Sequence, residues 1–409
     1  MGRLGRDCFD AAPVPMRVAE ALALIRARLP VLAGIETVPV AAADGRILAA
    51  DLAAPIDLPP FDNAAVDGYA VAASALGPGE TVLPVRGRVP AGTAPAATDP
   101  GAAVRIFTGA PMPPGTDTVA MQEDVRVAGD GVALPPGLAP GANRRRAGED
   151  VARGARALPA GRRLAPRDLA LAAALGIPAL PVRARLRVAL FSTGDELTGA
   201  GDAPGPAGIH DANRPMLAAI LARLGAVPTD LGILRDEPGA LRARLAAAAA
   251  DHDVILTSGG VSVGEEDHVR AAVEAAGALT IWRLAIKPGR PVALGIVAGT
   301  PFVGLPGNPG AAYVTAQIVL APLILHLSGA ADAPAPLSVR SGFARTKRAG
   351  RREYLRVCLR AGPDGAAEAV PAPGGALSGL AASDGLVELA EDLTELRPGE
   401  PLPYRPHPF

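Results

Sequence analysis

Four polar loops in the second half of the sequence carry the side chains best suited to hold a metal ion and an anion. Each loop directly follows an apolar run. The loops are FSTGDEL with Glu196, ILRDEP with Asp236, TSGGVSVGEED with Asp267, and LPGNPG with Pro306, Gly307 and Asn308. Glycines let backbone N–H groups approach an anion, and carboxylates are hard oxygen ligands for Mg²⁺. The pattern predicts a metal-assisted phosphate or oxyanion site.

Small, hydroxyl-bearing and basic residues complete this candidate site. The small and hydroxyl-bearing ones are Thr193, Gly194, Ser258, Gly259, Gly260, Ser262 and Gly264. Of the 40 basic residues, only Lys287 and Lys347 are lysines, so the lysine of AIKPGRP stands out. In this short turn, Lys287 and Arg290 would offset the acidic loops and hold a dianion. Lys287 also has a simpler interpretation, as a solvated turn residue.

Two other interpretations of the acidic loops stay open. Acidic residues are common at helix starts because they suit the helix dipole, which is enough to explain Glu265 and Glu266. GVSVG fits the G-x-S-x-G pattern of serine hydrolases, with Ser262 as the nucleophile. In such enzymes the strand runs almost into the serine, and the carboxylates here would disfavour an oxyanion. No G-x-x-x-x-G-K-[ST] or G-x-G-x-x-G motif occurs.

The elements around these loops predict a common position for them. From about residue 185, apolar strand-like runs alternate with helical patterns, which indicates βαβ units and a mostly parallel sheet covered on both faces. Ligands bind beyond the carboxyl ends of the strands in such sheets. The loops are therefore expected at one edge of the sheet.

The remainder of the chain predicts further domains. Residues 16–29 have helical spacing, residues 55–160 are rich in Pro and Gly with short β-like runs, and residues after about 330 suggest a small β domain. Within the first half, Asp62, Thr108 and Asp150 lie in the polar stretches PPFDNAAVDGYAV, RIFTGAPMP and NRRRAGEDV. Taken singly, each of these stretches is typical of an ordinary polar loop.

Composition limits the function classes. The 409 residues have a formal net charge of −1, which gives no support for a nucleic-acid or membrane-surface binder. The two cysteines show no disulfide or metal-binding spacing, and the first residues lack the apolar region of a secretory signal, so we expect a cytoplasmic protein. Residues 311–327 are apolar but contain Thr315, Gln317 and Pro322, which favours a buried core helix over a membrane span.

Seven ordered stretches resemble one known family. PPFDNAAVDGYA, RIFTGAPMP, NRRRAGED, FSTGDEL, TSGGVSVGEED, LAIKPGRP and LPGNPG are similar to motifs of the molybdopterin molybdenumtransferases. This is the MoeA family, which is homologous to the C-terminal part of gephyrin. The resemblance spans essentially the whole chain, and seven motifs in order are far more specific than any one alone.

The resemblance implies a reaction, partners and a fold. The reaction is the insertion of molybdenum from molybdate into adenylylated molybdopterin, with Mg²⁺ as cofactor and AMP as a product. The protein would be an elongated homodimer supplied by an upstream adenylyltransferase. Its fold would be α/β with additional β domains: an N-terminal region of two intertwined domains over 1–184 with a β-rich insert at about 55–145, a MoaB/MogA-like molybdopterin-binding domain with a parallel sheet over 185–330, and a C-terminal β-barrel over 331–409.

By motif, the resemblance also implies residue roles. Glu196, Asp236 and Asp267 match the functional acids of the pterin-binding domain and are the expected magnesium ligands. Lys287 and Arg290 match a KPGK-like turn. Asp62, Thr108 and Asp150 match residues that the other domains contribute to a site shared with the partner subunit.

The sequence departs from the family pattern at several positions. Ala64 and Val66 replace Ser and Met, Arg290 replaces a lysine, and Ala311 replaces a serine, whereas Ser378 is retained. The acids are unaffected, so the departures concern substrate anchoring. Besides the enzyme, two hypotheses remain: a non-catalytic pterin-binding scaffold, and the serine hydrolase based on Ser262.

Overall fold

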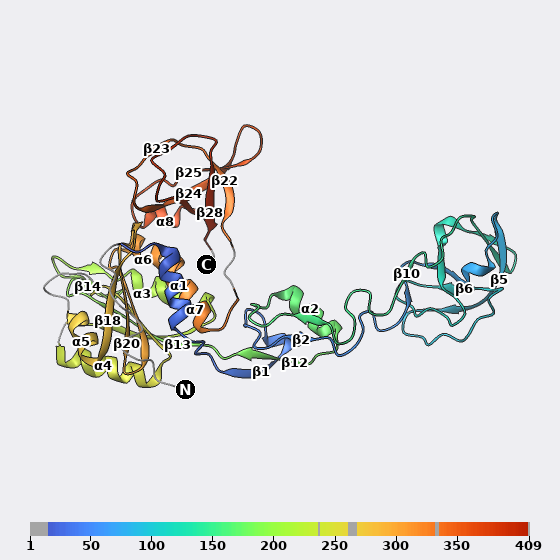
Figure 1. Cartoon of the computed structure of the whole chain (residues 1–409), viewed down its shortest axis with the longest axis horizontal. Helices are drawn as coiled ribbons and strands as arrows, with labels where there is room; N and C mark the ends of the chain where they lie inside the picture. The colour runs from blue at the N-terminus through green and yellow to red at the C-terminus, as the bar shows by residue number, and fades with distance from the viewer. Residues whose placement is uncertain (1–14, 236–237, 261–267, 332–334, 408–409) are drawn as a thin grey trace. The chain divides into compact units, whose positions relative to one another are not determined.

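The chain divides into two compact units, which are described separately. The computed structural model describes residues 15–235, 238–260, 268–331 and 335–407. The first unit comprises the described parts of 1–36, 45–47 and 183–409, and the second comprises 37–44 and 48–182 (Figure 1). The predicted boundaries at 184/185 and 330/331 remain a prediction.

A six-stranded mixed sheet forms the centre of the first unit. Its strand order is β16-β13-β17-β21-β20-β18. The bounds are β13 (Arg187–Thr193), β16 (Val227–Leu234), β17 (Val254–Ser258), β18 (Gly277–Arg283), β20 (Pro291–Val297) and β21 (Thr300–Leu305). The neighbouring strands β16, β13, β17 and β21 are parallel to one another. Strand β20 runs antiparallel to both of its neighbours, β21 and β18. The α/β prediction is confirmed, with β18 as a strand that the sequence pattern did not reveal.

Helices cover both faces of this sheet. Successive side chains of a strand point to opposite faces, so each face carries its own apolar cluster that a layer of helices buries. On β13, Val188 and Leu190 belong to one cluster, and Ala189 and Phe191 to the other. The first cluster is covered by α1, α3, α6, η5 and α7, and the second by α4 and α5 (Figure 1). The helices are α1 (Val18–Arg28), α3 (Asn213–Arg223), α4 (Pro238–Asp251), α5 (His268–Ala276), α6 (Pro309–Thr315), the π-helical η5 (Ala316–Leu320) and α7 (Ala321–Leu327).

The helix Pro309–Leu327, formed by α6, η5 and α7, is long and apolar enough to cross a membrane by length and composition alone. Most of it is buried against the sheet, as expected of the core helix of a globular domain. The prediction of a buried helix over 311–327 agrees with this packing.

A closed five-stranded barrel follows in the first unit. Its strands are β22 (Leu337–Ser341), β24 (Arg352–Ala361), β25 (Ala367–Pro371), β26 (Gly385–Leu389) and β28 (Pro401–Pro406). The pairing of β24 with β26 closes the ring. The two-residue strand β19 (Ile286–Lys287), from the segment after β18, pairs in parallel with β24, so that Lys287 lies opposite Glu353. The predicted C-terminal barrel is confirmed, and its sheet includes a piece of the preceding domain.

The second unit contains a six-stranded sheet of order β7-β4-β6-β5-β9-β8. Its strands are β4 (Gly68–Val71), β5 (Thr81–Val89), β6 (Ala103–Ile106), β7 (Thr118–Met121), β8 (Arg126–Ala128) and β9 (Gly131–Leu134). A helix, α2 (Pro166–Ala174), and short paired strands complete the unit. The paired strands are β1 (Ile35–Pro39) with β12 (Ala179–Arg183), β2 (Leu52–Ala53) with β11 (Arg156–Leu158), and β3 (Asn63–Ala64) with β10 (Arg144–Arg145).

Candidate functional site

The carboxyl ends of β13 and β17 place four buried hydroxyl groups side by side. The groups belong to Ser192 and Thr193 on β13 and to Thr257 and Ser258 on β17, and all four residues are nearly inaccessible to solvent. Ser192 is in register with Ser258. By alternation, Ser192 and Ser258 face α3, whereas Thr193 and Thr257 face the α4 and α5 side. Both faces of the strand ends are therefore polar where the apolar core stops.

Glycines after these strands bring two predicted loops into contact. Gly259 has a φ of +89°, and a Cβ at this position would lie 2.5 Å from the backbone oxygen of Thr193. Gly260 has a φ of +62°, and its Cβ would lie 2.6 Å from Thr193 Oγ1. Only a residue without a side chain allows this close approach in this conformation. The TSGG and STG segments are thus neighbours, as predicted for one sheet edge.

Asn213, the first residue of α3, joins the TSGG segment to the LPGN segment. Its Nδ2 donates hydrogen bonds of 2.7 Å to Ser258 Oγ and of 2.7 Å to the carbonyl oxygen of Gly307. Ser258 Oγ also contacts the carbonyl oxygen of Pro306 at 3.4 Å. Sequence reasoning missed Asn213. A polar residue at the start of a helix next to the sheet edge was the one available signal.

Several buried polar atoms at these strand ends have no protein partner. They are Ser192 Oγ, Thr193 Oγ1, Asn213 Oδ1 and Thr257 Oγ1. A buried polar group without a hydrogen bond is costly, and native proteins usually satisfy such groups through water or a ligand. These four oxygen atoms can therefore accept further hydrogen bonds from a polar molecule at the sheet edge.

 A polar cavity of about 330 Å³ lies beside Gly194. Its lining includes Asp195, Thr198, Asp202 and Arg235. Oxygen donors of this kind suit a hard cation such as Mg²⁺.

The three predicted magnesium ligands are only partly described. The Glu196 carboxylate turns back toward Gly194, where a Cβ would lie 2.6 Å from Glu196 Oε2. Asp236 and Asp267 lie outside the described residues, as do Ser262 and Gly264. Within the described parts of the chain, no group of three or more His, Cys, Asp and Glu side chains could hold a metal ion. The convergence of the three acids stays a prediction.

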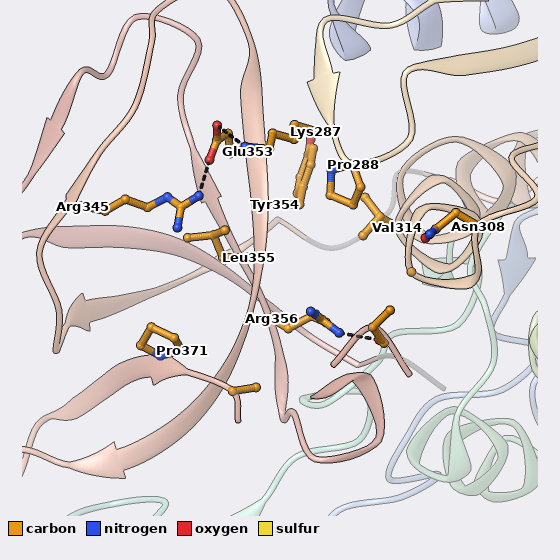
Figure 2. A pocket seen from close by; sticks show the side chains of 13 residues that line it. Lys287, Pro288, Asn308, Val314, Arg345, Glu353, Tyr354, Leu355, Arg356 and Pro371 are labelled. Atoms are coloured by element: carbon orange, nitrogen blue, oxygen red, sulfur yellow. Dashed lines mark hydrogen bonds and ion pairs between the residues drawn. The ribbon is translucent and has the colours of Figure 1, made fainter. Parts of the chain in front are cut away.

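Lys287 lines a second cavity, of about 340 Å³, between the segments around Asn308 and the barrel strand β24 (Figure 2). Asn308 caps α6 by accepting a 3.1 Å hydrogen bond from the backbone N–H of Ala311. Arg290 is exposed and is not among the residues described as lining this cavity, so its role in binding stays a prediction.

Three cationic side chains and one carboxylate line this second cavity. The cations are Lys287, Arg345 and Arg356, and the carboxylate is that of Glu353. Glu353 Oε2 lies 2.8 Å from Arg345 Nη2, and its Oε1 lies 3.5 Å from Lys287 Nζ (Figure 2). Burial opposes ionisation of this carboxyl, but the hydrogen bond and charge of Arg345, together with the charge of Lys287, lower the pKa of Glu353. Counting +3 and −1, the lining carries a net charge of +2 near neutral pH.

Arg356 holds the loop that precedes the short helix α8 (Ser378–Ala381). Its Nη1 donates hydrogen bonds to the carbonyl oxygens of Gly375, at 2.7 Å, and of Ala376. Ser378 Oγ accepts a 2.9 Å hydrogen bond from the N–H of Gly375 in the same loop. Sequence reasoning missed Arg345, Glu353 and Arg356, because nothing local marks them and only the β19–β24 pairing brings them to Lys287.

In the second unit, the structure brings the three predicted polar stretches together around β3. Asp62 Oδ1 accepts a 2.8 Å hydrogen bond from the N–H of Ala147, and its Oδ2 lies 3.5 Å from Arg144 Nη1. The N–H of Met112 donates to the carbonyl oxygen of Asp62 at 2.9 Å. The N–H of Asp150 donates to the carbonyl oxygen of Leu58 at 3.0 Å. The stretches containing Asp62, Thr108 and Asp150 therefore form one loop cluster.

Thr108 is held by a carboxylate within this loop cluster. Both its backbone N–H, at 2.8 Å, and its hydroxyl, at 2.7 Å, donate to Asp67 Oδ1. These two hydrogen bonds lower the pKa of the Asp67 carboxyl. The hydroxyl oxygen of Thr108 keeps its acceptor capacity and is exposed at the loop surface.

Comparisons with known proteins cover most of the chain. Residues 16–176 match a family described as MoeA N-terminal region (domain I and II), residues 189–326 match a probable molybdopterin binding domain, and residues 338–406 match the MoeA C-terminal region (domain IV).

Curated relatives and solved structures agree with these matches. Molybdopterin molybdenumtransferase 2 of Mycobacterium tuberculosis (strain CDC 1551 / Oshkosh) is 37% identical, over 90% of this chain and 93% of its own length. A molybdopterin molybdenumtransferase of Haemophilus influenzae is 41% identical, over 77% of this chain and 78% of its own. The crystal structure of a molybdopterin biosynthesis MoeA protein from Pyrococcus horikoshii OT3 is similar with a TM-score of 0.81 at 28% identity, covering 96% of this chain and 100% of that one.

Proposed function

The chain belongs to the MoeA family, and from this premise we propose that it is a molybdopterin molybdenumtransferase. The proposed reaction transfers molybdenum from molybdate to adenylylated molybdopterin and releases AMP. The relatives named molybdopterin molybdenumtransferase support the transferase assignment. The adenylylated form of the substrate and the release of AMP are our proposal.

The observation that carries the proposal is the charge of the cavity containing Lys287. Molybdate is a tetrahedral dianion, and a lining with a net charge of +2 matches it. Arg356 has no carboxylate partner among the described ion pairs, so its charge is available to an oxyanion. Guanidinium and ammonium groups form the strongest hydrogen bonds to such anions.

The sheet edge supports a second part of the proposal, the binding of the pterin substrate and its phosphates. Thr193, Gly259 and Gly260 form a close-packed turn at this edge, in which the N–H of Gly259 donates to the carbonyl oxygen of Leu305 at 3.1 Å, and we propose that the phosphates bind beside this turn. The unpartnered oxygen Asn213 Oδ1 accepts a hydrogen bond from an N–H group of the ligand, since it cannot donate one itself. Asn213 also fixes the separation between this turn and Gly307.

We propose that Glu196, Asp236 and Asp267 hold Mg²⁺ at this edge. The neighbouring lining includes Asp195 and Asp202, whose carboxylate oxygens suit a hard cation, beside the guanidinium of Arg235. A bound Mg²⁺ would neutralise charge on the phosphoanhydride whose cleavage releases AMP.

The remaining parts of the proposal concern partners and location. We propose a cytoplasmic homodimer in which Asp62, Thr108 and Asp150 of one subunit complete the site of the other. An upstream adenylyltransferase would supply the substrate. Nothing in the charge of the chain, −1 overall, favours a nucleic-acid or membrane partner.

An assay of AMP release tests the function. The purified protein, given adenylylated molybdopterin, molybdate and Mg²⁺, should release AMP, and a chelator should stop the release. Asp267→Asn should lower the rate by at least about a hundredfold, as expected when an electrostatic catalytic group is lost. Asp364→Asn, which alters an exposed ion pair of the barrel with Arg340, is the matched control and should leave the rate unchanged.

Two outcomes would point to the other hypotheses. Binding of the pterin without AMP release by the wild-type protein would indicate the scaffold. Covalent labelling of Ser262 by a fluorophosphonate would indicate a serine hydrolase.

A further inference from the structure

Glu353 is the only carboxylate among the described residues that line the cavity containing Lys287. It lies on β24, and its side chain is only 10% exposed. Each of its oxygens faces a cation, Arg345 on one side and Lys287 on the other. A buried acid at the wall of an anion site is unexpected, because it repels the ligand that the neighbouring cations attract.

The two ion pairs of Glu353 differ in strength. The contact with Arg345 is 2.8 Å long, and the Arg345 side chain is 35% exposed. The contact with Lys287 is 3.5 Å long, and the Lys287 side chain is 55% exposed. Lys287 is therefore the partner that can turn from Glu353 to a ligand, while Arg345 stays paired. With both cations beside it, the pKa of Glu353 is lowered although burial opposes its ionisation, so it is ionised near neutral pH.

We propose that Glu353 sets the charge of this oxyanion cavity and thereby weakens its preference for more highly charged phosphates over a dianion; this inference rests on the proposed function. With the carboxylate, the lining has a net charge of +2, and without it the charge is +3. Coulomb energy scales with the product of the charges, so the missing carboxylate favours a ligand more strongly the more negative it is.

The selection has a consequence for the reaction mixture. The proposed substrate carries a phosphoanhydride, so phosphate groups and molybdate are present together. A cavity with a charge of +3 would favour pyrophosphate-like groups over molybdate more strongly than a cavity with a charge of +2. Glu353 keeps the cavity accessible to molybdate, the less highly charged anion, but lowers the affinity of the cavity for both anions.

Equilibrium dialysis of the full-length protein with molybdate, and separately with inorganic pyrophosphate, tests this inference at low ionic strength. Glu353→Gln should bind molybdate on the order of tenfold more tightly than the wild type, and pyrophosphate by a larger factor. The control Glu368→Gln removes a carboxylate of the same barrel, paired with Arg360 outside the cavity, and should change neither affinity.

A double variant separates charge from packing. Glu353→Gln combined with Arg345→Gln restores the net charge of +2 and removes both members of the buried pair. If charge decides, the ratio of the two affinities should return close to that of the wild type. If Glu353 acts by positioning Lys287 or Arg345, the double variant should instead lose affinity for both anions.

Each outcome decides between the proposals. A folded Glu353→Gln variant with an unchanged affinity ratio overturns the role of Glu353 and leaves the proposed function intact, provided that the wild type binds molybdate. Wild-type protein that binds neither anion overturns both the molybdate cavity and this inference. If Glu353→Gln does not fold, Arg345→Gln alone, with a charge of +1, must weaken pyrophosphate binding more than molybdate binding; an equal loss contradicts the proposal.

Discussion

Two glycines have nearly the same φ but different surroundings. Comparing substitutions at the two positions therefore separates the energetic cost of close packing at the sheet edge from the cost of the backbone conformation. Gly259 has a φ of +89° and Gly399 a φ of +87°, but only a Cβ at Gly259 would meet backbone, the oxygen of Thr193 at 2.5 Å. Nothing lies within 4 Å of a Cβ at Gly399. The contact at Gly259 is with backbone, so it cannot be relieved by turning a side chain.

Gly259→Ala should therefore cost more than Gly399→Ala. Both substitutions bear the strain of a left-handed backbone, about 1–2 kcal/mol. Gly259→Ala should cost at least about 1 kcal/mol more in the free energy of unfolding and should also strongly reduce AMP release. Chemical denaturation and the AMP assay measure the two effects. Equal losses of stability, with full activity in both variants, would show that the close approach to Thr193 is unimportant.

At the residue scale, sequence reasoning singled out the glycines and acids of the loops but missed Asn213 and Glu353. Gly259, Gly260 and Glu196 each lie in a loop that follows an apolar run. This position and their residue types are enough to predict a ligand-binding loop. Asn213 and Glu353 show no such local signal. Their importance follows from hydrogen bonds and ion pairs to residues 45 and 66 positions away in the chain.

At the scale of elements, the last residues of the barrel connect strand β28 to α6. His407 Nδ1 lies 2.7 Å from the hydroxyl of Tyr313 on α6, and its Nε2 lies 2.8 Å from Ser383 Oγ. Ser383 Oγ donates its own hydrogen to the carbonyl oxygen of Leu380 at 2.7 Å. It therefore accepts from His407 Nε2–H, and in a neutral imidazole Nδ1 accepts from the Tyr313 hydroxyl.

The pH dependence of stability should report this contact. Burial lowers the pKa of His407, partly opposed by the charge of Asp384 and a backbone hydrogen bond of Ser383. The unfolded chain, with an ordinary histidine pKa of about 6.5, then binds more protons than the fold, so stability is lost as the pH falls from about 7 through the folded pKa. His407→Gln should flatten this part of the curve of melting temperature against pH.

The exposed His210 provides the matched control. His210→Gln should leave the slope between pH 7 and 5 as it is in the wild type. If His407→Gln and the wild type give parallel curves, the imidazole does not need to be neutral in the fold.

The sequence predicted most elements and their class, but not how distant elements pair. Strand and helix alternation after residue 185 was sufficient for the α/β sheet, because parallel strands need helical crossovers. Strand β18 was missed; it begins at Gly277, directly after the last residue of α5. The pairing of β19 with β24 joins residues 286–287 to 352–353, and no local pattern specifies such a contact.

At the scale of the whole molecule, the proposed homodimer predicts complementation between inactive variants. Thr108→Ala alters the loop cluster of the second unit, and Asp267→Asn alters the proposed magnesium site. If each site combines the two regions from different subunits, mixed dimers of these variants should contain one intact site. Co-expression should then recover up to about half of the wild-type AMP release per mixed dimer, by the symmetry of a two-fold interface.

Measurements of mass and activity check this prediction. Light scattering should give twice the chain mass of 41.1 kDa. Purified dimers carrying one affinity tag of each kind should be active, whereas dimers of either single variant should not. A monomeric mass, or mixed dimers as inactive as their parents, would contradict a site shared between subunits.

The short strand that carries Lys287 also affects how the protein can be divided. Because Ile286 and Lys287 hydrogen-bond to the barrel through β24, the α/β domain expressed by itself would leave this edge without its neighbour. A hybrid with another C-terminal domain would have to reproduce that parallel edge before its lysine could be held in place. The α/β domain and the barrel are thus connected by strand pairing as well as by the chain. Exchanging the barrel alone would remove the strand that pairs with Ile286 and Lys287.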